Sequence, residues 1–484
     1  MNDKENQLTR KFGLPMAICA IVGVVIGSGI YFRNEDVIRA VQGNLLLGIL
    51  AWLVGGIIML SFAYCFARLA TRHEKMNGAV DFGEAMVGKK YGYFLGWYMG
   101  LAYIPAITAV MAWVSARFTV ILFGWDVSPV TSGQTFMLAG FYLIAINVMN
   151  MLSHKLTAKF HMSATVIKLI PLILMGIVGT IVGLINGTTV SNVGSTLVDV
   201  AVENPFMTAL VATAFAYDGW WVVASLNSEV KNSRRNLPIA MIVGGIIIIA
   251  IYLLYFIGVF SSSSIDDLAG QAGVLGAFRG IFSNIAGTLL FIFIVISCLG
   301  TLNGVVMAGQ RSMYSLSLRN RGPNPELFSQ VDKKTNNPHN SSAIAMLISA
   351  CVLVLLGGNF MGWYGTNIDI PGLASIFFWA MLIPIFIAMI FKQKDLNWFD
   401  RFVAPVVAIA GAIFMVYASI DAQRINVLWY AIATVVIMGF GALFLIQSGE
   451  HRGFKALYHI VRGKHKKPEA IPDETNVNDD EISK

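Results

Sequence analysis

The stretch Ile26-Gly27-Ser28-Gly29-Ile30 lies in the middle of the first long apolar segment of the chain. A second stretch, Phe215-Ala216-Tyr217-Asp218-Gly219, interrupts the sixth such segment. Hydrocarbon cannot replace the backbone hydrogen bonds that a helix loses at such a place. Non-helical backbone at membrane depth therefore survives only where it faces protein or a water-filled cavity. Each stretch predicts a helix break in such a setting.

The composition of the 484-residue chain is that of an integral membrane protein. It is 56% hydrophobic and 13% charged, whereas soluble domains have about 25% charged residues. We expect about twelve apolar spans of roughly 20 residues, the length that crosses a hydrocarbon core. Their estimated ranges are 14–41, 45–70, 84–122, 134–151, 157–185, 206–229, 236–261, 281–318, 341–357, 372–391, 402–420 and 426–447. The predicted fold class is an all-α membrane protein.

Lysine and arginine residues are sorted between the two sides of the membrane. They cluster in the segments after even-numbered spans, whereas segments 123–133, 186–205 and 358–371 contain none. Under the positive-inside rule, both termini are expected to be cytoplasmic. Because the charge is sorted in this way, the net charge of +7 does not indicate a nucleic-acid partner.

The chain divides into a cytoplasmic N-terminus (1–13), a membrane domain (14–450) and a cytoplasmic tail (451–484) that is expected to be partly disordered. Spans one to five (about 14–185) and six to ten (about 206–391) each begin with a broken helix, and two extra helices follow at about 402–447. Matched breaks favour an inverted 5+5 repeat and a secondary transporter with its substrate site at the breaks.

The first break offers two kinds of backbone group. Unwinding at Gly27 and Gly29 frees N–H groups at the start of one half-helix and carbonyls at the end of the other. The N–H end suits a carboxylate and the carbonyl end an ammonium group, and an amino acid zwitterion presents both. Alternatively, the glycines only permit close helix packing, and spacing alone favours neither interpretation.

The second break adds a carboxylate. Asp218 at mid-depth is energetically costly and is therefore a functional candidate. It either binds a cationic group or accepts N–H bonds from the unwound turn, and the second role is favoured because free backbone needs partners. Phe215 and the pair Trp220-Trp221 either close over a substrate or simply pack.

Lys168 stands alone in an apolar segment, nine residues beyond Lys159, which places it roughly 13 Å deep. A lysine at mid-membrane costs about 2.5–3.5 kcal/mol, so Lys168 is expected to face the interior and to meet carbonyls or a carboxylate. Its ammonium could replace a sodium ion, carry a proton, or form a structural salt bridge with Asp218 or Glu229. Glu229 itself either anchors topology at the interface or forms an inner gate with Arg68, Arg311 or Lys231.

Other function classes lack their signatures. His73-Glu74 has no second histidine of a zinc motif, and no G-x-S-x-G nucleophile motif occurs. No pore motif suggests a channel. We therefore expect no enzyme activity, no cofactor and no metal.

Three motifs in combination carry a family resemblance. They are Ile26-Gly27-Ser28-Gly29-Ile30-Tyr31, Phe215-Ala216-Tyr217-Asp218-Gly219-Trp220, and Glu229-Val230-Lys231-Asn232 closing on Asn236-Leu237-Pro238. Over about residues 12–450 the chain resembles the amino acid–polyamine–organocation superfamily, and within it the L-type amino acid transporter family and its bacterial serine/threonine exchanger-like members. The resemblance implies a LeuT-type fold of twelve helices, with helices 1 and 6 broken. It also implies sodium-independent amino acid transport across the plasma membrane, commonly by exchange.

The resemblance assigns roles to individual residues. The N–H groups of Ser28, Gly29 and Ile30 would hold the substrate carboxylate, and the carbonyls of Val25, Phe215 and Asp218 the amine. Phe215 would be the aromatic gate, and Lys168 the fifth-helix lysine in the place of a sodium ion. The complete expected substrate site is Val25, Ile26, Gly27, Ser28, Gly29, Ile30, Phe215, Ala216, Tyr217, Asp218 and Gly219.

The sequence also departs from the family pattern. Trp221 stands where several L-type members have asparagine, which favours small to medium neutral amino acids. Segment 123–133 has no cysteine, so no disulfide-linked heavy chain is expected, and the protein is predicted to be a monomer or weak oligomer. The alternative function is a proton-coupled amino acid symporter in which Lys168 carries the proton.

Overall fold

The computed structural model describes residues 13–449 except 73–77, 126–127, 129, 194–201, 222–229, 270–272, 333–334 and 336. Within these ranges the chain is helical and forms no strand. Ten of the described helices are long and apolar enough to cross a membrane, and Leu14–Gly23 and Pro205–Ala216 are shorter apolar helices. The protein is therefore an all-helical, multi-pass membrane protein, as the composition predicted.

The helices of the first half of the chain are α1 (Leu14–Val25), α2 (Gly29–Ala40), α3 (Leu45–Arg72), α4 (Ala79–Met86), α5 (Lys89–Tyr98), η1 (Met99–Tyr103), α6 (Ile104–Phe123), α7 (Gly133–Leu152), α8 (His154–Ile167), α9 (Leu169–Leu174), η2 (Met175–Gly179), α10 (Thr180–Ile185) and α11 (Thr188–Val193). Those of the second half are α12 (Pro205–Ala216), α13 (Ser233–Ser262), α14 (Ile265–Ala269), α15 (Gly273–Gln310), α16 (Ser312–Ser317), α17 (Pro325–Phe328), α18 (His339–Phe360), α19 (Ile370–Ala380), α20 (Ile383–Lys392), η4 (Phe399–Val403), α21 (Ala404–Gln423) and α22 (Ile425–Gly449).

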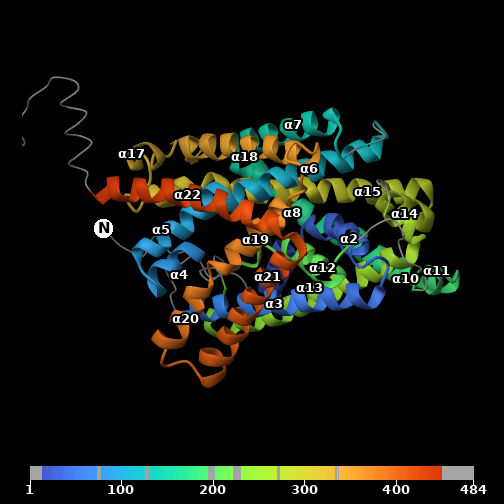
Figure 1. Cartoon of the computed structure of the whole chain (residues 1–484), viewed down its shortest axis with the longest axis horizontal. Coiled ribbons are helices and arrows are strands. Elements are labelled where there is room, and N and C mark those ends of the chain that lie inside the picture. The colour runs from blue at the N-terminus through green and yellow to red at the C-terminus, as the bar shows by residue number, and fades with distance from the viewer. Residues whose placement is uncertain are drawn as a thin grey trace, which may run out of the picture.

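The long helices run side by side along the long axis of the molecule (Figure 1). α13 packs against α1 and α3, and α12 packs against α2 and α3. A second group is formed by α6, α7, α15 and α18, which contact one another. Helices α8 and α9 contact α15, and α1 contacts α8. The two helices that end at the predicted breaks, α1 and α12, thus belong to the same packing group.

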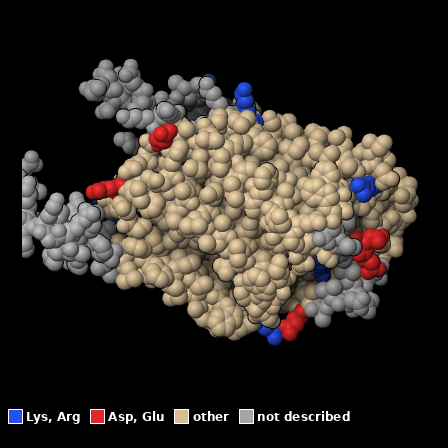
Figure 2. Space-filling model, turned by 90° about the horizontal axis from the view of Figure 1, so that it is seen from above, with Lys and Arg blue, Asp and Glu red and all other residues tan. Residues whose placement is uncertain are grey.

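Small residues allow the closest of these helix contacts. Gly176 and Gly179 in η2 face Gly258 of α13, and a Cβ atom at Gly179 would lie 2.6 Å from the Gly258 carbonyl oxygen. Membrane helices commonly associate by such close approach. An apolar side chain gains little free energy by moving from lipid into a helix interface, so close packing contributes instead. The centre of the face in Figure 2 is uncharged, and charged side chains lie at its margins, as a lipid-facing surface requires.

Several boundaries differ from those expected. The span expected at 84–122 is divided, because α4 ends at Met86 and Gly88, with a left-handed φ of 141°, precedes α5. The span expected at 157–185 has a one-residue turn at Lys168. Of the four cysteines, Cys65 and Cys298 are buried, whereas Cys19 and Cys351 are exposed.

Candidate functional site

The first break is a short unwound segment between two half-helices. α1 ends at Val25, Ile26 has extended backbone angles (φ −68°, ψ 103°), and α2 begins at Gly29. Ser28 caps α2, and its carbonyl oxygen accepts hydrogen bonds from the N–H groups of the first turn. The segment Ile26-Gly27-Ser28 therefore separates the carbonyl end of α1 from the N–H end of α2.

The second break is a turn closed by a carboxylate. α12 ends at Ala216, and Gly219 has a left-handed φ of 95°, a conformation that favours glycine. The N–H of Gly219 donates to Asp218 Oδ1 at 2.7 Å, and the hydroxyl of Ser375 in α19 donates to Oδ2 at 2.6 Å. Both carboxylate oxygens therefore have donors within the protein, which is the geometry of the turn-closing role.

The two breaks touch through their backbones. A Cβ atom at Gly29 would lie 2.9 Å from Cα of Ala216 and 3.4 Å from the carbonyl oxygen of Phe215, so glycine is needed for this approach. Tyr252 of α13 links the two breaks through its hydroxyl group. Its buried hydroxyl lies 2.9 Å from the carbonyl oxygen of Ala216 and 3.2 Å from that of Val25.

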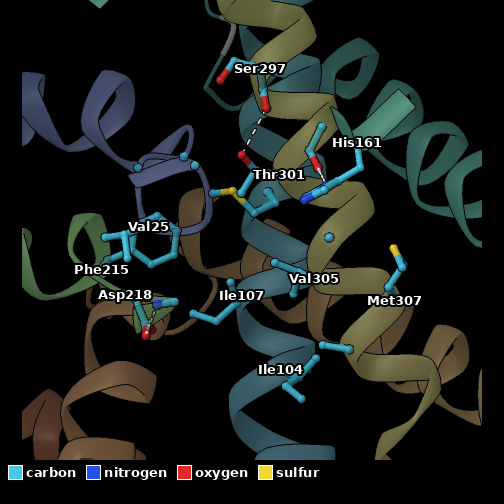
Figure 3. Close-up of a pocket in the computed structure, with 18 of the residues that line it drawn as sticks. Val25, Ile104, Ile107, His161, Phe215, Asp218, Ser297, Thr301, Val305 and Met307 are labelled. Carbon is cyan, nitrogen blue, oxygen red and sulfur yellow. Dashed lines mark hydrogen bonds between the residues drawn. The ribbon is translucent and has the colours of Figure 1, made fainter. Parts of the chain in front are cut away.

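A cavity of about 340 Å³ lies where the breaks meet. Figure 3 shows Phe215 and Asp218 on one side and Thr301 and Val305 on the other, with Ile107 between them. The expected site residues that line the cavity are Val25, Gly27, Gly29, Lys168, Phe215, Ala216, Asp218 and Gly219. The expected residues that do not line it are Ile26, Ser28, Ile30 and Tyr217. Glu229, the expected gate, lies outside the described residues.

The start of α2 presents backbone N–H groups beside the cavity. The N–H of Ser28 donates to Thr301 Oγ1 at 3.2 Å, and its hydroxyl donates to Met111 Sδ at 2.8 Å. Within the described part of the chain, the N–H groups of Gly29 and Ile30 have no acceptor. They lie at the positive end of the α2 dipole, where an anionic group is stabilised.

Lys168 lies at the junction of α8 and α9, and its side chain is buried (5% exposed). Its ammonium donates to the carbonyl oxygen of Gly23 in α1, and its own carbonyl accepts from the Tyr31 hydroxyl of α2 at 2.6 Å. The positive charge therefore lies at the carboxyl end of α1, where the helix dipole is negative. As far as described residues go, no ion pair joins Lys168 to Asp218; Glu229 is not among them.

An aromatic and a charged side chain of α2 cover Phe215. Its ring meets that of Phe32 edge-on, with 6.5 Å between the centroids and 89° between the planes. The guanidinium group of Arg33 lies 5.0 and 5.1 Å from the centroids of these two rings. Arg33 in turn forms ion pairs with Asp369 at 2.6 Å and with Asp36 at 2.9 Å. This arrangement fixes the Phe215 side chain at one end of the cavity.

Many of the residues on the cavity wall opposite Phe215 and Asp218 were not identified from the sequence. The missed residues include Tyr103, Met111, His161, Ser297 and Thr301. His161 stands seven residues, or two helical turns, before Lys168, so helical spacing could have found it. No local signal marks the α15 pair, because Ser297 and Thr301 are ordinary in an apolar helix, where the Thr301 hydroxyl bonds to the Ser297 carbonyl at 3.0 Å.

Comparison with known proteins decides the family. A family model described as amino acid permease matches residues 12–443. The chain belongs to the amino acid permease family.

The relatives of this permease are transporters. It is 27% identical to the serine/threonine exchanger SteT of Bacillus subtilis, over 86% of this chain and 92% of that protein. It is 23% identical to b(0,+)-type amino acid transporter 1 of Mus musculus (91% and 88%) and 23% identical to the cystine/glutamate transporter of Homo sapiens (80% and 79%). These matches confirm the resemblance to the L-type branch of the amino acid–polyamine–organocation superfamily.

The permease presents no cluster of three His, Cys, Asp or Glu side chains suited to a metal ion in the part that the structure describes. The polar groups of its cavity are backbone ends and the side chains of Tyr103, His161, Lys168, Asp218, Trp221, Ser297, Thr301 and Arg311. Such a set can bind and release a zwitterion without any change of covalent bonds.

Proposed function

We propose that this permease exchanges small to medium neutral amino acids across the plasma membrane of a bacterial cell, without sodium, by alternating access. The observation that carries the proposal is the meeting of the two helix breaks at one cavity, with Gly29 and Ala216 in backbone contact. Amino acid transport is the activity that the names of the relatives state, and one of them, SteT, is an exchanger.

The substrate carboxylate binds the N–H groups of Gly29 and Ile30 in this proposal. They are unbonded within the described residues and lie at the positive end of α2, so a carboxylate gains both hydrogen bonds and dipole stabilisation. The N–H of Ser28, which was expected to join them, already donates to Thr301, and it takes part only if that bond is released.

The substrate amine binds carbonyl oxygens at the ends of α1 and α12. The carbonyls of Val25 and Phe215 each accept one hydrogen bond from the protein, which leaves each a second lone pair. The Asp218 carboxylate is engaged by its turn and by Ser375, so it supports the binding segment and does not select cationic substrates.

The position of the Lys168 ammonium group supports the proposal that transport does not need sodium. Its ammonium occupies the carbonyl end of α1 and bonds to Gly23, and a fixed positive charge there removes the need for a bound cation. The same residue is the basis of a second candidate function, proton-coupled symport, because a buried ammonium can also release a proton.

Alternating access follows from the packing groups. In the proposed twelve-helix, 5+5 arrangement, α1–α2 is the first helix and α12 begins the sixth. α1, α3, α12 and α13 move as one bundle against α6, α7, α15 and α18. The contacts within each group support this division. The cluster of Phe32, Arg33, Phe215 and Asp369 closes one end of the cavity, and Phe215 is the gate.

The remaining expectations accompany this proposal. Both termini are cytoplasmic, the protein works in the lipid bilayer as a monomer or weak oligomer without a disulfide-linked heavy chain, and it is not an enzyme. Glu229 as an inner gate also stays a proposal.

Uptake into proteoliposomes separates the two candidate functions. Labelled serine, alanine, threonine and leucine are supplied outside, with or without unlabelled amino acid inside, at equal and unequal pH. Uptake that requires internal amino acid supports exchange. Uptake into empty vesicles that follows an inward proton gradient would instead establish symport and make Lys168 the first candidate for the proton carrier.

A further inference from the structure

The helix that runs from α5 to α6 widens in its middle to the π turn η1, Met99–Tyr103. The N–H of Ile104 bonds to the carbonyl of Met99, five residues earlier. Pro105 explains the wide turn, because proline has no N–H and its ring crowds the carbonyl four residues before it. π turns within α-helices change the direction of side chains and are frequent at functional sites. Here the last residue of the turn, Tyr103, lines the cavity.

Tyr103 is held in one orientation by two aromatic neighbours. Its ring stacks on Phe378 of α19, with 4.6 Å between the centroids and 22° between the planes. Its hydroxyl accepts a hydrogen bond of 2.9 Å from the indole N–H of Trp221. The Trp221 ring also meets Phe378 at 6.2 Å and 70°. These three rings form a closed set, which we name the aromatic clamp (Tyr103, Trp221 and Phe378).

Trp221, which follows the second break, is the most exposed member of the aromatic clamp. Tyr103 and Phe378 are buried, whereas Trp221 is only partly buried and lines the cavity. It lies five residues beyond the end of α12, so the regular α-helix does not fix its side chain. Its indole N–H is a donor that needs an acceptor when it leaves water, and Tyr103 supplies it.

We propose that Tyr103 is a positioning residue that holds the Trp221 indole as the cavity wall limiting the side-chain size of the transported amino acid. This inference rests on the proposed function and deepens it. Tyr103 fixes the ring through one hydrogen bond and, together with Phe378, through ring packing. Without the hydroxyl, the indole N–H loses its acceptor, the ring leaves its position for part of the time, and the cavity admits longer side chains.

The test measures kcat/KM for leucine and for alanine in proteoliposomes that contain unlabelled alanine. Tyr103→Phe keeps the stacked ring and removes the acceptor for Trp221, together with the hydrogen bond that the Tyr103 hydroxyl donates to the Asp218 carboxylate. The loss at Asp218 should change kcat/KM equally for leucine and alanine, so it cancels in their ratio. The matched control is Tyr98→Phe on the same helix, because Tyr98 is equally buried and its hydroxyl donates to the Ala374 carbonyl at 3.0 Å, outside the cavity. Trp221→Phe replaces the indole by a smaller ring, and the variant with both substitutions completes a double-mutant cycle.

We expect Tyr103→Phe to raise the leucine-to-alanine ratio of kcat/KM about three- to tenfold, the effect of one neutral hydrogen bond. Trp221→Phe should raise it about tenfold, the effect of space for one or more methylene groups. Tyr98→Phe should leave it unchanged. Because Tyr103 acts through Trp221, adding Tyr103→Phe to Trp221→Phe should change the ratio no further.

Three results would overturn the inference while alanine transport by the unaltered protein still supports the proposed function. They are an unchanged ratio in Tyr103→Phe, an equal change in Tyr98→Phe, or additive effects in the double variant. If Tyr103→Phe does not fold, Trp221→Phe decides alone, and an unchanged ratio there overturns the inference. Failure of the unaltered protein to transport any amino acid would instead refute the proposed function, and this inference with it.

Discussion

Replacement of Gly29 by alanine tests the contact between the two breaks. The added methyl group would lie 2.9 Å from Cα of Ala216, whereas carbon atoms pack at about 3.5–4.0 Å. The neighbour is backbone and cannot rotate away, so the two breaks must separate by about 0.6 Å or more.

The energetic cost follows from two opposing terms. Overpacking of this kind costs about 1–3 kcal/mol, and the higher helix propensity of alanine returns about 0.5–1 kcal/mol because Gly29 is the first residue of α2. The net loss spans about 0–2.5 kcal/mol, and its midpoint of about 1.2 kcal/mol reduces the population of the closely packed arrangement by a factor of roughly 8. Substrate binding needs both breaks, so apparent affinity should fall by a similar factor.

The assay is sodium-free binding and exchange of labelled amino acid, together with thermal inactivation of the purified protein. Gly140→Ala in α7 is the matched control, because nothing lies within 4 Å of a Cβ atom there, and it should preserve transport. Gly29→Ala with the affinity and thermal stability of the unaltered protein would refute the argument that the breaks touch.

Four further substitutions test other parts of the site. Lys168→Met removes the ammonium that bonds to the Gly23 carbonyl; because a hydrogen bond to a charged group contributes about 1.5–3 kcal/mol, we expect sodium-free affinity to fall about tenfold or more, and unchanged affinity would contradict the role of this charge. Tyr252→Phe removes the hydroxyl shared by the two breaks, so the midpoint of thermal inactivation should fall; an unchanged midpoint would mean that the breaks hold together without it. Arg33→Gln and Asp369→Asn should each slow exchange, and the double variant should be no slower than the more damaging single one, whereas additive losses would show that the two residues do not act as a pair.

The positions of the breaks could be predicted because their signals are local. Gly27, Ser28 and Gly29 form one short stretch, and Asp218-Gly219 another, within segments that are otherwise apolar. Lys168 could be predicted as an interior residue for the same reason, since a charge is costly in hydrocarbon. The structure then selects a carbonyl partner, Gly23, from the carbonyls or carboxylates that the sequence left open.

The rest of the site depends on packing between distant segments. Thr301, which takes the N–H of Ser28, lies 273 positions away, and Tyr252 lies 227 positions from Val25. Hydroxyl-bearing and aromatic residues are common in membrane helices, so nothing local distinguishes these. The π turn that directs Tyr103 was also not foreseen, although Pro105 inside an apolar segment is the signal that could have indicated it.

The most direct test of the central claim is counterflow in sodium-free proteoliposomes. Vesicles are loaded with unlabelled alanine or serine, and a trace of the labelled amino acid is added outside at equal pH on both sides. The account predicts that label accumulates inside transiently above its external concentration, and that it does not accumulate in unloaded vesicles. Absence of accumulation for every neutral amino acid supplied, or a strict requirement for sodium, would contradict the claim that the two breaks form the site of a sodium-independent amino acid exchanger.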